Sequence, residues 1–188
     1  MRENYIFLAD GFEETEALGT LDVLRRGGVD VKTVSLREDR TVTGAHDVPV
    51  VADWTYGEFK SRIRPAETDV LVFPGGMPGT KHLAENAELM ALMKRHYAEG
   101  GAVAAICAAP GLVVSQLPDL RGRKFTCYDG FEEALLAKGA EYIKVPAVAD
   151  GNLITGRGPG CAMDFGLVIV EYLKGSDVAA RVKQGLML

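Results

Sequence analysis

One cysteine, Cys107, occupies a position in the chain that favours reactivity. It ends the apolar run 102–106 and is followed directly by the apolar segment 108–114, a pattern that predicts a buried strand and then a helix. A thiol on such a sharp turn lies at the positive end of the helix dipole, where backbone N–H groups can hold a thiolate or an oxyanion. We expect this field to lower the thiol pKa. The alternative is a buried core cysteine, because free cysteines are often fully buried.

Three carboxyl groups follow the first predicted strand, on Glu13, Glu14 and Glu16. A carboxyl buried beside a thiol has its pKa raised by desolvation and by any thiolate charge. It can then donate a hydrogen bond to the sulfur and move protons near neutral pH. The residue types leave open which glutamate does so, and acidic residues that open a helix often only complement its dipole.

Glycine-rich turns supply further candidates. In the Pro-Gly-Gly turn at 74–76, glycine allows close approach, so the N–H groups of Gly76 and Ala108 are candidate oxyanion donors. The turn lacks the spacing of a dinucleotide site. The Arg-Gly-Pro-Gly turn at 157–160 precedes a predicted helix, and its arginine can hold an anion. The other two cysteines, Cys127 and Cys161, are interpreted as structural.

These residues need a scaffold, and the hydrophobic pattern predicts an α/β fold. Strands are expected at 5–9, 29–36, 70–73, 102–106, 124–128 and 153–155, with short ones near 42 and 48–51. Helices are expected at 13–26, 87–99, 108–114, 132–138, 162–173 and 177–184. Strands that alternate with helices predict a mostly parallel sheet with helices on both faces. The loop expected at 74–79 contains the Pro-Gly-Gly turn.

A short motif, Asp-Gly-Phe-Glu-Glu, occurs at both 10–14 and 129–133. Each copy follows a predicted strand and opens a predicted helix, with the aspartate placed as an N-cap and a glutamate three residues later, as in a capping box. In a parallel sheet both turns lie at the carboxyl edge, where ligands bind. Cys107 and the 74–76 turn are expected there too, so we expect four turns to build one site.

Bulk composition excludes several classes of protein. The 188 residues fit a single domain, 1–188, and the net charge of −5 argues against nucleic acid as a partner. The first residues show no signal-peptide pattern, and no apolar stretch is long enough to cross a bilayer. Three cysteines without Cys-x-x-Cys spacing and three histidines without ligand spacing predict a cytoplasmic protein with no metal and no other cofactor.

Four segments together resemble the ThiJ/PfpI superfamily. They are Ala-Asp-Gly-Phe-Glu-Glu-Thr-Glu (9–16), Phe-Pro-Gly-Gly (73–76), Ala-Ala-Ile-Cys-Ala-Ala-Pro (104–110) and Arg-Gly-Pro-Gly (157–160). Within the superfamily the chain is most similar to the Parkinsonism-associated deglycase (DJ-one-like) branch, bacterial type, over essentially its whole length. The resemblance implies a flavodoxin-like sandwich with a nucleophile elbow, a homodimer with each site near the interface, and no cofactor.

The resemblance also assigns roles. Cys107 matches the family's reactive, oxidation-prone cysteine, and Glu16 matches the protonated glutamate that hydrogen-bonds its sulfur. Gly76 and Ala108 match the backbone donors. The further substrate or interface candidates are Gly75, Tyr128, Asp129, Arg26, Arg157, Pro159 and His46.

Two positions depart from the family pattern. Tyr128, followed by Asp129, stands where many relatives have a histidine, and His46 stands where some relatives have an interface arginine. Tyrosine is a poor general base near neutral pH, although Tyr128 can orient a substrate carbonyl. The missing histidine weakens the prediction of a cysteine peptidase or amidase.

Two functions remain. In the first, a Cys107 thiolate adds to a small aldehyde or glycated substrate to form a hemithioacetal, and Glu16 moves protons until a hydroxy acid is released, as in conversion of methylglyoxal to lactate. In the second, the protein is an oxidative-stress sensor or chaperone-like factor whose Cys107 is oxidised to a sulfinate.

Overall fold

A seven-stranded sheet forms the centre of the computed structural model, which describes residues 3–62 and 68–188. The strand order is β10-β11-β7-β6-β1-β2-β5, and neighbouring strands are parallel except β10 and β11. The strands are β1 (Glu3–Leu8), β2 (Val31–Ser35), β5 (Trp54–Thr55), β6 (Thr68–Phe73), β7 (Ala102–Ile106), β10 (Ala147–Asp150) and β11 (Leu153–Gly156). The predicted α/β fold with a mostly parallel sheet is confirmed.

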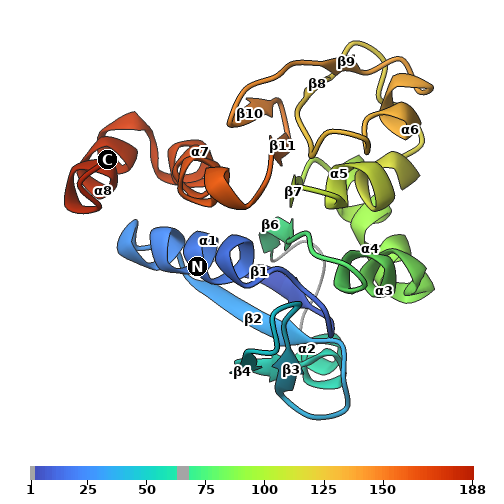
Figure 1. Cartoon of the computed structure of the whole chain (residues 1–188), viewed down its shortest axis with the longest axis vertical. Helices are drawn as coiled ribbons and strands as arrows, with labels where there is room; N and C mark the ends of the chain where they lie inside the picture. The colour runs from blue at the N-terminus through green and yellow to red at the C-terminus, as the bar shows by residue number, and fades with distance from the viewer. Residues whose placement is uncertain (1–2, 63–67) are drawn as a thin grey trace.

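Helices cover both faces of the sheet (Figure 1). One face carries α1 (Glu14–Arg26), α7 (Ala162–Lys174) and α8 (Ser176–Gly185). The other carries α2 (Tyr56–Arg62), α3 (Gly79–Glu85), α4 (Ala87–Ala98), α5 (Ala109–Leu112) and α6 (Glu133–Leu136). Within the described residues, no helix combines the length and the apolar character that a membrane span requires.

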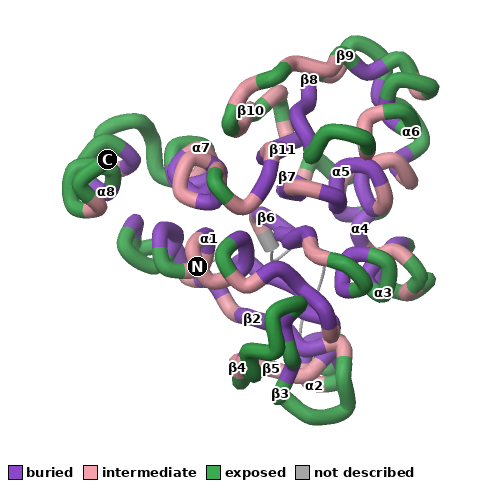
Figure 2. Tube along the Cα trace, in the orientation of Figure 1, coloured by how far each residue is buried: buried purple, intermediate pink, exposed green. Residues whose placement is uncertain are grey.

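Successive side chains along each strand point to opposite faces of the sheet, so the hydrophobic core has two parts, one on each face. In β1, Tyr5 and Phe7 pack with α2 and α4, whereas Ile6 and Leu8 pack with α1 and α7, because successive side chains point to opposite faces. Both faces are covered, so the central strands are buried along their length, as the purple tube in Figure 2 shows. This is why these strands read as continuous apolar runs.

Several elements differ from the sequence prediction. The strand expected at 124–128 is only β8 (Lys124–Phe125), which pairs with β9 (Glu141–Tyr142) outside the central sheet. The helix expected after Cys107 is the four-residue α5 and the 3-10 turn η2 (Val114–Gln116). The sequence analysis missed α2, α3, β5, β9 and β10. All five are short, so they depend on tertiary contacts rather than on local propensity.

The repeated motif does not form capping boxes. Glu13, not Asp10, caps α1, because its Oε2 accepts the N–H of Glu16 at 2.6 Å. Asp10 instead accepts the N–H of Thr43 at 3.0 Å. This bond helps to anchor the antiparallel hairpin of β3 (Thr41–Thr43) and β4 (Pro49–Val51), whose strands were predicted. In the second copy, α6 has no side-chain cap, and Asp129 binds side chains from other segments.

Candidate active site

Cys107 directly follows β7 and has a φ of 64°, a left-handed conformation that residues other than glycine rarely adopt. Its N–H donates to the C=O of Gly156 at the end of β11, and its C=O accepts the N–H of Tyr128, both at 3.0 Å. These two bonds hold the strained backbone from two sides. The sharp turn expected at this junction is present.

The turns after β1 and β6 meet beside this elbow. The C=O of Gly75 accepts the N–H of Glu13 at 2.9 Å. Gly76 has a φ of 87°, and a Cβ at this position would lie 2.3 Å from the Glu13 nitrogen. Glycine at position 76 is therefore required both by its conformation and by the close approach of the neighbouring turn.

Glu16 brings a carboxyl group to the thiol from the first turn of α1. It is 1% exposed, and its Oε2 accepts the N–H of Gly75 at 2.7 Å. Its Oε1 is buried without a nitrogen or oxygen partner among the described residues, and the thiol of Cys107 interacts with this carboxyl. Glu13 caps the helix and Glu14 binds a histidine, so of the three glutamates it is Glu16 that contacts the thiol.

Burial makes both members of this pair harder to ionise. Desolvation raises the pKa of Glu16 to about 7, against the hydrogen bonds with Cys107 and the Gly75 N–H. Burial and the negative charge of Glu16 raise the pKa of Cys107, while contacts with the N–H groups of Ala108 and Gly76 lower it. The expected lowering of the thiol pKa by a helix is wrong, because α5 has only four residues and burial dominates.

We expect the Glu16→Gln variant to differ from wild type in stability as a function of pH. The folded-state pKa of about 7 lies above the ordinary value of 4.5, so protonation of Glu16 stabilises the fold fully below pH 4.5, and this contribution is lost as pH rises through about 7. Glutamine stays neutral. The free energy of unfolding of Glu16→Gln, measured in urea, should therefore increase by about 3 kcal/mol relative to that of wild type between pH 4.5 and about 8. A difference that does not change with pH would contradict the raised pKa.

The Gly75→Ala variant should disturb the contact between carboxyl and thiol. A Cβ at position 75 would lie 2.5 Å from both the Cβ of Cys107 and Oε2 of Glu16, so both side chains must shift. We expect a loss of about 1–3 kcal/mol in the free energy of unfolding. The control is Gly160→Ala, where an added Cβ meets no heavy atom within 4 Å. Equal stability of the two variants would contradict this account of the packing.

Other predicted residues gather in one pocket of about 420 Å³ beside the elbow. It is lined by Tyr128, Asp129, Arg157, Gly158, Pro159, Gly160 and Cys161. Although β8 lies outside the central sheet, the backbone of Tyr128 reaches Cys107, and Nη2 of Arg157 donates to both carboxylate oxygens of Asp129 at 3.2 and 3.1 Å. The sequence analysis missed Cys161 as a lining residue. Its position directly after the 157–160 turn was the available signal.

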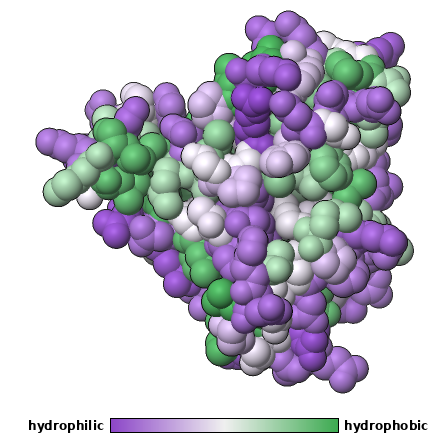
Figure 3. Space-filling view, in the orientation of Figure 1, coloured by the Kyte–Doolittle hydropathy of each residue, from purple (hydrophilic) through white to green (hydrophobic). Residues whose placement is uncertain are grey.

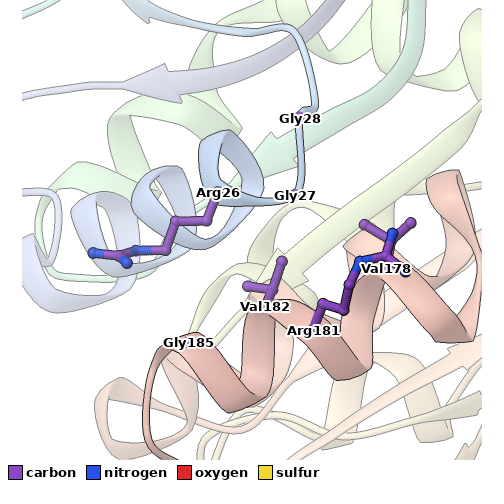
Figure 4. A pocket seen from close by; sticks show the side chains of 7 residues that line it. All are labelled: Arg26, Gly27, Gly28, Val178, Arg181, Val182 and Gly185. Carbon is purple, nitrogen blue, oxygen red and sulfur yellow. The ribbon is translucent and has the colours of Figure 1, made fainter.

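Arg26 lies elsewhere. It ends α1, ten residues and so about 15 Å along the helix from Glu16, and its Nε donates to Asp22 at 2.6 Å. There it lines a second pocket, between the end of α1 and helix α8 (Figure 4). The structure therefore does not bring Arg26 to the thiol, and its role at a dimer interface stays a prediction.

The histidines contact groups other than the thiol. His46 binds Glu14 through Nδ1 at 2.7 Å, while His82 and His96 lie against the carbonyls of Asp10 and Ala102. None of these contacts provides a base for Cys107, as a peptidase-type pair requires.

One cluster on the described part of the chain could hold a metal ion. Ligand atoms of Glu13, Glu14 and His46 lie within 4.8 Å of one another. The spacing of the histidines in the sequence did not reveal this cluster. Its members already bind one another or cap α1, so we assign no metal to it.

A model of the DJ-1/PfpI family matches residues 3–172. The chain belongs to this family. It is 36% identical over 181 residues to Protein DJ-1 homolog B of Arabidopsis thaliana, covering 96% of this chain but only 40% of that protein. It is 32% identical to Deglycase PH1704 of Pyrococcus horikoshii, covering 88% of this chain and 96% of the relative.

The fold of this DJ-1/PfpI protein is also found in solved structures. A mutant of the DJ-1 superfamily protein STM1931 from Salmonella typhimurium superposes with a TM-score of 0.88 at 36% identity, covering 100% of this chain and 98% of that one. The resemblance seen in the four sequence motifs and the flavodoxin-like architecture are confirmed. A deglycase among the relatives supports enzymatic activity in the family.

Proposed function

We propose that this DJ-1/PfpI protein processes small reactive aldehydes, with Cys107 as nucleophile, Glu16 as proton shuttle and no cofactor. The observation that carries the proposal is the environment of the thiol. A buried carboxyl with a pKa of about 7 and the N–H groups of Gly76 and Ala108 all act on it. A carboxyl that titrates near neutral pH is suited to proton transfer, and the relationship to a deglycase supports the reaction class.

The reaction needs no external oxidant or reductant. The Cys107 thiolate forms a C–S bond with the aldehyde carbon of methylglyoxal, and the carbonyl electron pair moves to oxygen, where Gly76 and Ala108 can donate hydrogen bonds. Glu16 protonates this oxygen with the proton that it took from the thiol, and then moves the proton of the former aldehyde carbon to the neighbouring carbon. The hydroxyl proton passes at the same stage from the first oxygen to the former ketone oxygen, which leaves a thioester carbonyl beside a new hydroxyl group. The resulting thioester is hydrolysed by water, which releases lactate and restores the thiol.

The test is formation of lactate from methylglyoxal by the purified protein, without glutathione, metal ions or any other addition. Lactate that accumulates in proportion to the protein, above a heat-inactivated control, would support the proposal. No lactate above that control would contradict it.

The same environment favours a second function as an oxidative-stress sensor or chaperone-like factor. Peroxide would convert the Cys107 thiolate to a sulfenate and then a sulfinate, whose oxygens can accept hydrogen bonds from protonated Glu16 and the nearby N–H groups. Mass spectrometry after mild peroxide treatment tests this function. Oxidation of Cys107 ahead of Cys127 and Cys161 would support it, and equal oxidation of all three would contradict it.

The proposal includes a homodimer in the cytoplasm, a compartment in which the three free cysteines would stay reduced. An apolar area lies over the α8 end of the molecule in Figure 3, and Met187 and Leu188 after α8 are 95% and 59% exposed. Exposed apolar residues of this kind suit an interface. Light scattering should give twice the chain mass of 20.2 kDa, and a monomer at micromolar concentration would contradict the dimer.

A further inference from the structure

Arg157 uses only part of its hydrogen-bonding capacity. It donates to Asp129 through Nη2 alone, and its side chain is 38% exposed. Within the described parts of the chain, Nε and Nη1 have no hydrogen-bond partner. A guanidinium presents five N–H donors in a planar fork that matches a carboxylate. One edge of Arg157 therefore remains available to a second anion.

Asp129 does not neutralise this arginine, because it is shared. It accepts a hydrogen bond from the hydroxyl of Tyr142 at 2.8 Å and pairs with Nζ of Lys144 at 3.5 Å. The bond from Tyr142 and the charges of Arg157 and Lys144 keep the pKa of Asp129 low, so it is ionised at neutral pH. Two cations share this one carboxylate, so Asp129 by itself does not balance both of their charges. Asp164, which acts on the thiol of Cys161, does not line the pocket.

The pocket adjoins the turn at Cys107 through both backbone hydrogen bonds of that residue. Tyr128, which lines it, donates its N–H to the C=O of Cys107, and Gly156, which accepts the N–H of Cys107, directly precedes Arg157. Cys161, another lining residue, is the N-cap of the 13-residue helix α7, whose positive end also favours an anion. A ligand held by Arg157 would therefore lie at the same edge of the sheet as the reactive thiol.

We propose that this pocket binds the carboxylate of a 2-oxoaldehyde that carries an acid group, and that Arg157 sets this specificity. The inference rests on the proposed aldehyde chemistry at Cys107. Methylglyoxal has no anionic group and would leave most of the 420 Å³ pocket unfilled. A suitable probe is 4,5-dioxopentanoate, which takes up one water to give 2-hydroxyglutarate. Its aldehyde carbon is oxidised to a carboxylate and its ketone carbon is reduced to an alcohol, so the reaction balances without another reactant.

The kinetic test compares 4,5-dioxopentanoate with its methyl ester, which has the same two carbonyls but no charge. In Arg157→Gln we expect the KM for the acid to rise about tenfold, because a charge-assisted hydrogen bond is lost, with the KM for the ester unchanged. Arg157→Lys should lie between this variant and wild type. Lys144→Gln removes the same charge from the same carboxylate but does not line the pocket, so it should change the KM for the acid by less than about twofold.

Equal changes for acid and ester, or equal effects of Lys144→Gln and Arg157→Gln, would overturn the assignment. A binding measurement separates it from the proposed function. Calorimetry of 2-hydroxyglutarate with Cys107→Ser needs no turnover, and adding Arg157→Gln should weaken its Kd about tenfold. If wild type converts neither aldehyde, the proposed function fails, while binding that depends on Arg157 still supports the pocket. No binding, or binding that is indifferent to Arg157, would overturn the inference.

Discussion

Cys107→Ser is expected to abolish conversion of methylglyoxal to lactate, with a loss of about a thousandfold or more in kcat. Serine fits the same space, but its hydroxyl is a much weaker nucleophile than a thiolate and ionises far less readily. The neighbouring groups do not compensate, because Glu16 already has a raised pKa and Tyr128 contacts the elbow through its backbone N–H. Lactate is measured by mass spectrometry over long incubations, so that a loss of about a thousandfold in kcat can be detected.

The matched control is Cys161→Ser. This thiol lines the neighbouring pocket, but no step of the proposed reaction uses it, so turnover of methylglyoxal should stay within about twofold of wild type. Thermal melting of both variants establishes that they are folded. Activity of Cys107→Ser above about one tenth of wild type, or a loss in Cys161→Ser as large as in Cys107→Ser, would refute Cys107 as the nucleophile.

Glu16→Gln is expected to lower kcat/KM about a hundredfold or more, because the amide can accept the N–H of Gly75 but cannot move a proton. The pH profile should change as well. In wild type, kcat/KM should rise through about pH 7, where Glu16 loses its proton, because its carboxylate can then take the proton of the Cys107 thiol as the thiolate attacks the aldehyde. The variant has no carboxyl at this position, so the inflection near 7 should disappear.

Glu14→Gln is the control for this second prediction. Glu14 belongs to the same first turn of α1, but its carboxylate binds His46. Glu14→Gln should keep the inflection near pH 7, and its kcat/KM should stay within a few-fold of the wild-type value. Full turnover by Glu16→Gln, or an unchanged inflection near pH 7, would exclude Glu16 as the proton shuttle.

The sequence by itself determined the central strands of the sheet, β1, β2, β6, β7 and β11, and the place of the thiol. The runs at 70–73 and 102–106 are apolar throughout because both faces of β6 and β7 are covered, and that pattern is visible without coordinates. The turn at Cys107 was predictable for the same reason, since it lies where one local pattern ends and another begins. Residue types alone did not decide which of the three glutamates contacts the thiol, and the family resemblance indicated Glu16.

Only the tertiary structure decided the electrostatics and the pocket. The pKa of the thiol rises rather than falls, because burial by distant segments and the charge of Glu16 outweigh the N–H groups of Gly76 and Ala108. Tyr128 contacts Cys107 through one backbone hydrogen bond, although the strand expected at 124–128 does not belong to the central sheet. Arg157 pairs with Asp129, which lies 28 residues earlier in the sequence. Short-range patterns reflect the local backbone. Burial and charge pairing depend on segments that only the folded chain brings together.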